Sequence, residues 1–319
     1  MLALLPTDGS DPLVEFGEEP EPPTAPDETL IQVDAFSINR GETFLLERPR
    51  HGWRPGRDVS GRVIRAAADG SGPAAGARVV GHPQQAGWAQ LAAVPSAAVA
   101  VLPDQLDVVE AAALPLAGLT ALRLVRASGA VAGMRVLLTG ASGGVGHYLT
   151  ELASASGAAV TAVSASPERA ERLVALGAAN VVRGLDDATG PYDIAFESVG
   201  GSSLPQALKL LAKGGRLIWF GQASRTPSQL DFFEFFAQTG ATIRHFDHDD
   251  SPVPDSTDLA TLVRLVASGR LHPEIGVVAD WTQTALVLED LRERRIRGNA
   301  VLRTVGDNRL INNPTRRCT

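Results

Sequence analysis

The stretch LLTGASGGVG, Leu137–Gly146, leads from an apolar segment into a run of glycines and small residues. Val145, Leu149 and Leu152 follow at helical spacing, so a strand is predicted to end here and a helix to begin. The glycines let backbone N–H groups approach an anion closely at the positive end of that helix, as a pyrophosphate seat requires. Their spacing, G-x-x-G-G-x-G, differs from the G-x-G-x-x-G fingerprint, and alone it also fits a tight turn that binds nothing.

The sequence that follows supports a dinucleotide site. From Met134 to about Phe246, short apolar segments alternate with helical ones, which is the pattern of a parallel, doubly wound sheet. The candidate strands are RVLLT, AVTAVS, ANVV, YDIAFE, RLIWFG and ATIRHF. Because a dinucleotide lies on the first strand-to-helix turn of such a sheet, we interpret the glycine stretch as its seat.

The end of the second candidate strand indicates which dinucleotide is bound. An acidic residue about twenty positions after the glycine loop would bind the ribose 2′-hydroxyl of NAD, but Ser164 stands there. Arg169 follows, and a guanidinium at this strand end suits a 2′-phosphate. Ser166 either contacts the same phosphate or begins a helix together with Pro167. NADPH is therefore predicted rather than NADH.

The regions on either side have a different pattern. Residues 1–117 contain short strands between Pro and Gly, such as ETLIQVDAFSI and ARVVGH, and predict an antiparallel, barrel-like domain. A helical stretch begins near Asp107, and Pro115 must break it or begin a new helix. We expect residues 118–252 to form the dinucleotide-binding domain. Residues 253–319, with two helices and the strand GNAVLRTV, are expected to fold back on the first domain.

Composition and charge exclude several classes of function. The net charge is −7, whereas a nucleic-acid surface needs clustered Lys and Arg. No apolar run approaches the roughly 20 residues that cross a bilayer. The N-terminal segment has no basic stretch before its apolar residues, so we expect no signal peptide and a cytoplasmic protein. The single cysteine, Cys318, allows neither an internal disulfide nor a cysteine-based metal site.

The chain resembles the medium-chain dehydrogenase/reductase superfamily, and within it the zinc-free quinone oxidoreductase branch. The matching stretches are AFSINRGE, PGRDVSG, GWAQLAAVP, AALPLAGLTAL, LLTGASGGVG, YDIAFESVGG, GGRLIWFG and GNAVL, in the family's order and spacing from about Pro26 to Val305. The resemblance implies an α/β architecture, with a GroES-like β-barrel domain, a doubly wound six-stranded Rossmann domain and a cofactor in the cleft between them. It also implies a homodimer joined through the last Rossmann strand, here Ala241–Phe246.

The resemblance and the glycine stretch together place the expected cofactor contacts. These positions are Gly140, Ser142, Gly143, Gly144, Val145, Gly146, Ser164, Ser166, Arg169, Val199, Gly221 and Asn299. One position departs from the family's pattern, because relatives carry a basic residue in G-K-x-V-L where this chain has Asn299. Arg297 is the candidate replacement for the phosphate contact that a basic residue would make.

Zinc alcohol dehydrogenases of this superfamily hold their metal with a Cys, with the His of a Gly-His-Glu motif and with a later Cys or Asp. By alignment these positions are Asn39, Arg57 and Leu116, and none of them is a credible zinc ligand. Without this Lewis acid, simple alcohol oxidation is disfavoured. Hydride addition to a quinone or a conjugated carbonyl demands less, because the developing negative charge delocalises and needs only a hydrogen-bond donor or water.

Three residues are expected beside the nicotinamide and its acceptor. Asn39 would line the pocket or form a local Asx turn. Arg57 would face the cleft or pair with Asp58. Thr120 matches the family position near the nicotinamide, although a helical Thr can instead bond back to its own backbone. We interpret the acidic run around His248 as a solvated loop rather than a metal site.

Three functions follow from these observations. The leading prediction is a metal-independent oxidoreductase that transfers hydride from NADPH to a small-molecule quinone or α,β-unsaturated carbonyl. An enoyl-thioester reductase of fatty-acid or polyketide assembly shares the same zinc-free fold. A non-enzymatic NADPH-binding sensor is the third possibility, because the fold alone does not decide function.

Overall fold

The computed structural model describes residues 1–236 and 238–304, which divide into two compact units. The first unit comprises Met1–Leu116, Asp255–Ala267 and the described residues from Ile275 onward. The second comprises Ala117–Pro254 and Ser268–Glu274. Ser268–Glu274 thus lies with the second unit, whereas the sequence analysis places all of 253–319 with the first. Cys318 lies outside the described residues.

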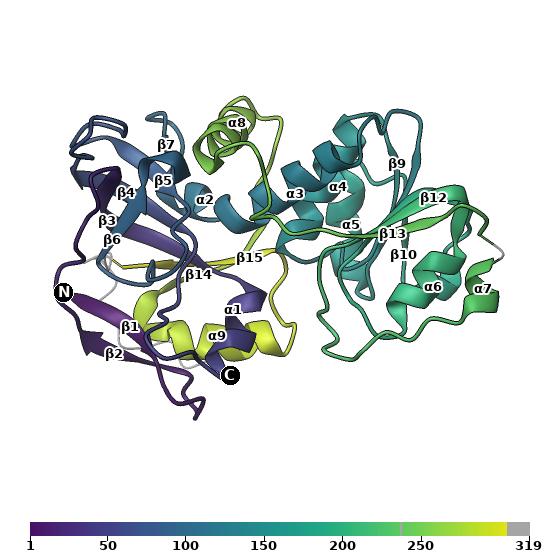
Figure 1. Cartoon of the computed structure of the whole chain (residues 1–319), viewed down its shortest axis with the longest axis horizontal. Coiled ribbons are helices and arrows are strands. Elements are labelled where there is room, and N and C mark those ends of the chain that lie inside the picture. Colours follow the sequence, from purple (N-terminus) through teal and green to yellow (C-terminus); the bar gives the residue numbers. More distant parts are fainter. Residues whose placement is uncertain (237, 305–319) are drawn as a thin grey trace. The chain divides into compact units, whose positions relative to one another are not determined.

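A six-stranded parallel sheet forms the second unit, in the order β10-β9-β8-β11-β12-β13 (Figure 1). Its strands are β8 (Arg135–Leu138), β9 (Ala159–Val163), β10 (Asn180–Val182), β11 (Tyr192–Glu197), β12 (Leu211–Trp219) and β13 (Thr242–His245). The strand order reverses between β8 and β11, and doubly wound sheets bind ligands outside the carboxyl ends of their strands at this point. The predicted doubly wound sheet is confirmed.

The helices of this unit follow from the local sequence. They are α3 (Pro115–Ala127), α4 (Gly144–Ala155), α5 (Pro167–Ala175), α6 (Ser203–Lys209) and α7 (Phe232–Phe236), with a short turn of 3-10 helix at Leu185–Asp187. α3 begins at Pro115, because proline is tolerated in the first helical turn. α4 packs against β9, α5 packs against β10, and α6 packs against both β11 and β12. The apolar residues of β8 are completely buried, as expected for a strand covered on both faces.

The first unit is built on a mixed sheet in the order β14-β15-β3-β4-β5-β7, with β6 also paired to β3. Its strands are β3 (Glu28–Ile38), β4 (Val59–Arg65), β5 (Arg78–Gly81), β6 (Leu91–Pro95), β7 (Val99–Val101), β14 (Ile275–Asp280) and β15 (Asn299–Arg303), and β1 (Leu2–Pro6) pairs with β2 (Val14–Glu18). The predicted antiparallel pairing holds for every pair of this sheet except β14 and β15, which run parallel. The antiparallel prediction for residues 1–117 is therefore confirmed, and the parallel pair lies in the C-terminal segment that joins this sheet.

Among the described residues, four α-helices and an apolar core that includes two stacked aromatic rings complete this unit. The helices are α1 (Arg40–Leu46), α2 (Val108–Ala112), α8 (Asp255–Ala267) and α9 (Thr284–Arg292), with 3-10 turns at Ser96–Ala98 and Trp281–Gln283. In the core, the rings of Phe36 and Trp88 stack with their centroids 5.6 Å apart, and the Trp88 indole N–H donates to the Ser37 carbonyl. Among the described helices, none has the length and apolar character that crossing a membrane demands.

Candidate functional site

The glycine stretch forms the turn between β8 and α4, and two of its glycines admit no side chain. Gly140 has a φ of +63°, and a Cβ atom there would lie 2.6 Å from the Ser198 hydroxyl oxygen. A Cβ atom on Gly146 would lie 2.4 Å from the Ala141 carbonyl oxygen. The backbone therefore turns tightly into the first turn of α4, with the Gly143 N–H donating to the Gly140 carbonyl at 3.1 Å.

Further predicted cofactor contacts gather at the same edge of the sheet. The Ala141 N–H donates to the Val163 carbonyl at 3.3 Å and ties the turn to the end of β9, where Ser164 follows. A Cβ atom on Gly221, after β12, would lie 3.1 Å from the Ser198 carbonyl oxygen. Gly140, Val199 and Gly221 thus surround or adjoin Ser198 after β11, at the point where the strand order reverses.

Ser164 carries the strongest local sign of a ligand. The residue is only 4% exposed, and among the described residues its hydroxyl oxygen has no hydrogen-bond partner. Buried hydroxyl groups in proteins are nearly always hydrogen-bonded. An orphaned hydroxyl beside a glycine turn fits a polar group supplied from outside the chain, such as a ribose or phosphate oxygen. These residues fit a bound dinucleotide.

The start of α5 contains a carboxylate that the sequence analysis did not consider. Ser166 is the N-cap of α5 with Pro167 at the first helical position, and its hydroxyl donates to the Glu168 carboxylate. This hydrogen bond, with a smaller contribution from the positive charge of Arg169, holds the pKa of Glu168 below its usual value. Ser166 thus occupies the N-cap position of α5, and its hydroxyl bonds to the Glu168 carboxylate instead of to a backbone N–H of the helix.

In the first unit, Asp58 is the centre of a buried hydrogen-bonded group. Its carboxylate accepts from the Ser37 hydroxyl, from Asn39 Nδ2 at 2.6 Å and from the Leu116 N–H at 2.8 Å, and His82 Nδ1 lies 3.5 Å away. Burial alone would raise the pKa of Asp58. The hydrogen bonds from its partners outweigh burial and hold the pKa of Asp58 below the usual value.

The residues around Asp58 are also those aligned with the zinc ligands of alcohol dehydrogenases. Asn39 and Leu116 both direct N–H groups at the carboxylate, and an N–H donor offers no lone pair to a metal. Arg57, at the position of the histidine ligand, carries a guanidinium, which is permanently charged and cannot ligate a cation. The residues present do not fit a zinc ion at this place.

Asn39 is the N-cap residue of α1, which runs from Arg40 to Leu46. Glu42, almost fully buried, accepts from the Asn39 backbone N–H at 2.9 Å and from the Gly56 N–H at 2.8 Å. Burial, with a smaller contribution from the nearby Asp58 charge, raises the pKa of Glu42 to about 7. Asn39 Nδ2 donates to both carboxylates, at 2.6 Å to Asp58 and 3.5 Å to Glu42. Its amide oxygen is therefore the group that it can offer a ligand.

Arg57 is positioned by His82, a residue to which the sequence analysis assigned no chemistry. Arg57 Nη2 lies 3.3 Å from His82 Nε2 and donates to Gln84 Oε1 at 3.2 Å, while His82 Nδ1 lies 2.7 Å from the Arg57 carbonyl oxygen. A guanidinium only donates, so Nε2 accepts and the proton of a neutral imidazole is on Nδ1. His82 thus contacts both the guanidinium and the backbone carbonyl of Arg57.

The other predicted site residues lie elsewhere in the two units. Thr120 is buried in α3 of the second unit, and Asn299 is buried at the start of β15 in the first. The structure thus brings Asn39 and Arg57 together around Asp58, and it brings the glycine turn together with Ser164, Val199 and Gly221.

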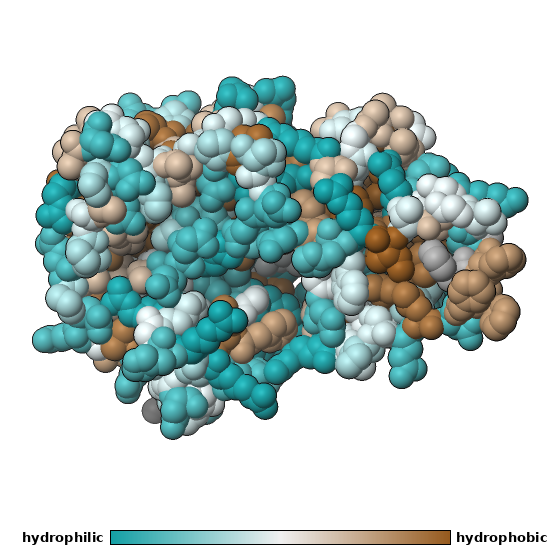
Figure 2. Space-filling model, viewed as in Figure 1, coloured by the Kyte–Doolittle hydropathy of each residue, from teal (hydrophilic) through white to brown (hydrophobic). Residues whose placement is uncertain are grey.

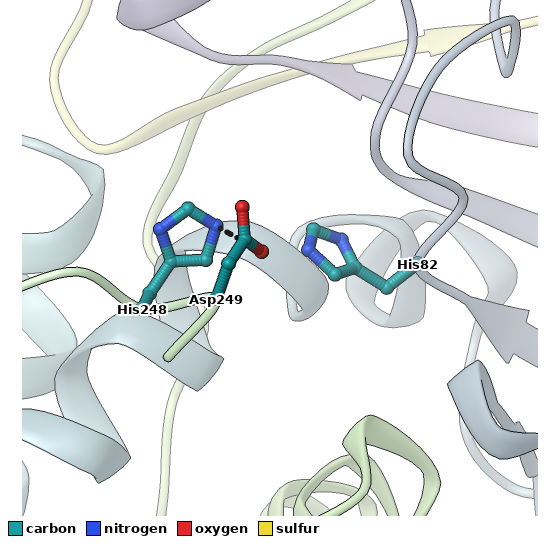
Figure 3. A group of neighbouring side chains, drawn as sticks. All are labelled: His82, His248 and Asp249. Carbon is teal, nitrogen blue, oxygen red and sulfur yellow. Dashed lines mark ion pairs between the residues drawn. The ribbon is translucent and has the colours of Figure 1, made fainter. Parts of the chain in front are cut away.

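The acidic run after β13 pairs with its own histidine. Figure 3 shows the His248 ring beside the Asp249 carboxylate, with His248 Nε2 3.1 Å from the nearer oxygen, and the Asp247 carboxylate lies 3.7 Å from Nδ1. Arg123 on α3 donates to the His248 and Val253 carbonyl oxygens. The segment is thus an anchored turn of the second unit.

Comparisons with known proteins agree with this architecture. A family model described as zinc-binding dehydrogenase matches residues 144–268. Quinone oxidoreductase-like protein 2 of Bos taurus is 27% identical over 301 residues, which cover 88% of this chain and 86% of the relative. Quinone oxidoreductase of Rattus norvegicus is 32% identical over 212 residues, or 61% of this chain and 64% of that protein. A mycobacterial protein solved in complex with NADPH has a TM-score of 0.86 at 25% identity, covering 95% of this chain and 100% of that one. Together these similarities support the medium-chain dehydrogenase/reductase superfamily, and within it the quinone oxidoreductase-like branch, as the family of this chain.

Proposed function

We propose that this protein transfers hydride from NADPH to a quinone or an α,β-unsaturated carbonyl, without a metal. The observation that carries the proposal is the Asp58 group. At the positions where zinc dehydrogenases hold a metal, this chain directs two N–H donors at a buried carboxylate and places a guanidinium beside it. Acceptors that delocalise their own negative charge need no Lewis acid and suit such a site.

The second unit would hold the cofactor. The backbone N–H groups of the Gly140–Gly146 turn, at the start of α4, suit a pyrophosphate. Ser164 and Arg169 suit the adenosine ribose and its 2′-phosphate, and Val199 and Gly221 follow the strands on the other side of the reversal. When bound, NADPH supplies the hydride from its nicotinamide ring. The similarity to a protein solved with NADPH supports this choice.

Arg57 is the residue proposed to stabilise the acceptor's developing negative charge. It is partly exposed, it is always cationic, and its orientation is fixed through Nη2 by His82 and Gln84. The amide hydrogens of Asn39 are used by Asp58 and Glu42. Asn39 is therefore proposed as an acceptor that orients the substrate, and Thr120 as a residue near the nicotinamide.

We further propose a homodimer through β13. This strand ends the parallel sheet, and it pairs with β12 alone among the described strands. The preceding helix α7 exposes the side chains of Phe232, Phe233 and Phe236, and Figure 2 shows apolar residues gathered where Figure 1 places α7. An unpaired edge beside exposed aromatic rings favours pairing with a second copy. Light scattering at micromolar concentration should give the mass of two chains, and a monomer alone contradicts this arrangement.

The activity is tested by following NADPH absorbance with purified protein against a panel of acceptors. Quinones and conjugated enones should consume NADPH, whereas saturated aldehydes should not. An enoyl-thioester that is preferred over every quinone and enone would reassign the protein to acyl-chain reduction. If no conjugated acceptor is reduced although NADPH binds, the protein is a sensor and the proposed reaction is wrong.

A further inference from the structure

Glu197, the last residue of β11, is completely buried at the point where the strand order reverses. Its Oε1 atom accepts from the Val199 N–H at 3.0 Å, from the Ser203 hydroxyl at 2.8 Å and from the Thr139 hydroxyl at 3.2 Å. The Gly200 N–H donates to both carboxylate oxygens, at 3.2 and 3.0 Å. One carboxylate thus accepts the hydrogen bonds of several N–H and O–H donors in the segment that follows β11.

The same carboxylate reaches across to the neighbouring strand. Thr139 follows β8 and directly precedes Gly140, so its bond to Glu197 joins the ends of the two strands that border the crevice. The Ser198 N–H donates to the Thr139 hydroxyl at 3.0 Å, and the Ser198 hydroxyl donates to the Thr139 carbonyl at 3.3 Å. We call these bonds among Thr139, Glu197 and Ser198 the β8–β11 seam.

The central acceptor of the seam is the charged carboxylate of Glu197, although a neutral acceptor could also take hydrogen bonds from the backbone N–H groups. Burying a carboxylate among neutral donors costs free energy that a serine or asparagine would avoid. Proteins retain such locally unfavourable choices mainly at functional sites. In a glutamine at this position, an NH2 group would replace one carboxylate oxygen and would face at least the Gly200 N–H donor.

We infer that Glu197 is a positioning residue for the dinucleotide, because its carboxylate fixes the Val199 turn to the start of the glycine turn. The inference rests on the proposed function, in which the Val199 side of the crevice faces the nicotinamide half of NADPH. The adenosine half would lie beyond β8, at the end of β9, where the Ser164 hydroxyl has no hydrogen-bond partner among the described residues. Loss of Glu197 should therefore weaken binding of the nicotinamide half of the cofactor more than binding of the adenosine half.

The experiment compares two ligands by fluorescence or calorimetric titration: NADPH, and adenosine 2′,5′-bisphosphate, which lacks the nicotinamide half. Glu197→Gln should raise the dissociation constant of NADPH by about tenfold or more. It should change the dissociation constant of the bisphosphate by less than about twofold. Thr139→Val removes one link of the seam and should weaken NADPH alone by about threefold. Thr161→Val, in the buried part of the neighbouring strand β9, is the matched control and should change neither dissociation constant.

The outcomes separate this inference from the proposed function. If Glu197→Gln binds NADPH as the wild type does, or loses both ligands to the same extent, Glu197 does not position the cofactor. If Glu197→Gln does not fold, Thr139→Val decides, and an unchanged NADPH affinity in that variant overturns the inference. If wild-type protein binds neither ligand, the proposed function fails and the inference fails with it.

Discussion

The two hydrogen-bonded groups of this protein differ in what they leave for a ligand. Around Asp58, the Ser37 hydroxyl, the Asn39 amide and the Leu116 N–H converge on one carboxylate inside the first unit. At the edge of the parallel sheet, the glycines lack side chains, so a ligand can come close to the backbone. The buried Ser164 hydroxyl there has no hydrogen-bond partner among the described residues. The first group is closed on itself, and the second is prepared for a molecule that is not part of the chain.

This difference separates two kinds of polar site that sequence patterns do not distinguish. Buried charges in a closed network stabilise the fold and orient the residues at its border, here Arg57 and Asn39. An orphaned polar group at a strand edge instead keeps hydrogen-bonding capacity for a ligand. Substitutions in the first group should therefore change stability before they change cofactor affinity, and substitutions in the second should do the reverse.

The largest effect on stability is expected from Asp58→Asn. The amide that replaces the carboxylate would direct its NH2 group at donors, so unfolding in urea should show a loss of about 3 kcal/mol. Glu42→Gln is the matched control, because Glu42 has a pKa of about 7 and a neutral amide resembles its protonated form. That variant should lose less than about 1 kcal/mol at neutral pH. Equal losses in the two variants would show that Asp58 is not the centre of the group.

The pH dependence of stability sharpens the same contrast. The pKa of Glu42 is raised from 4.5 to about 7 in the folded protein, so the folded state holds this proton more tightly than the unfolded state. The resulting stabilisation is complete below pH 4.5 and is lost as the pH rises through about 7. Across this window the free energy of unfolding should fall by about 3 kcal/mol more in the wild type than in Glu42→Gln. Parallel profiles for the two proteins would contradict the assignment.

Two glycine substitutions test the glycine turn at the edge of the parallel sheet. Gly146→Ala would force a Cβ atom to within 2.4 Å of the Ala141 carbonyl and shift the glycine turn, so NADPH affinity should fall by more than about tenfold. Gly41 is also a helical glycine, near the start of α1, but a Cβ atom there meets nothing within 4 Å. Gly41→Ala should leave the affinity unchanged and slightly stabilise the protein. Wild-type affinity in Gly146→Ala would show that the cofactor does not use this turn.

The smallest expected effect concerns the choice between the two nicotinamide cofactors. Arg169→Ala should weaken NADPH by about tenfold, because one charge-assisted hydrogen bond to the 2′-phosphate is lost. NADH affinity should stay within about twofold of the wild-type value. Arg172→Ala, one turn along α5 and paired with Glu274 at 2.6 Å, is the control and should change neither value. Equal losses of NADH and NADPH in Arg169→Ala would remove the basis for the NADP preference.

The regular part of this fold could be predicted because its signals are local. The glycine turn, the alternation of strands and helices after Met134 and the helix that starts at Pro115 all depend on neighbours in sequence. Helix α1, of seven residues, is too short to show a full apolar period, so the local pattern does not predict it. β14 also escaped prediction, as its alternation is brief and it contains Gly276.

The hydrogen-bonded groups could not be predicted from local patterns. Ser37, Asp58, His82 and Leu116 meet only because separate strands and a helix start bring them together. Glu197 and Thr139 are likewise 58 residues apart in sequence. Residue type marked Asn39 and Arg57 as candidates, but only the contacts show that Asn39 spends its amide hydrogens on two carboxylates.

The most direct test of metal-independent hydride transfer uses protein treated with a chelator and shown by metal analysis to be free of zinc. With NADPH stereospecifically deuterated at the nicotinamide C4 position and a conjugated enone, the product should carry deuterium on the carbon β to the carbonyl. The rate should equal that of untreated protein, because the proposed reaction does not use a metal at Asn39, Arg57 and Leu116. Activity that disappears with the chelator and returns with zinc, or efficient oxidation of ethanol, would contradict the account.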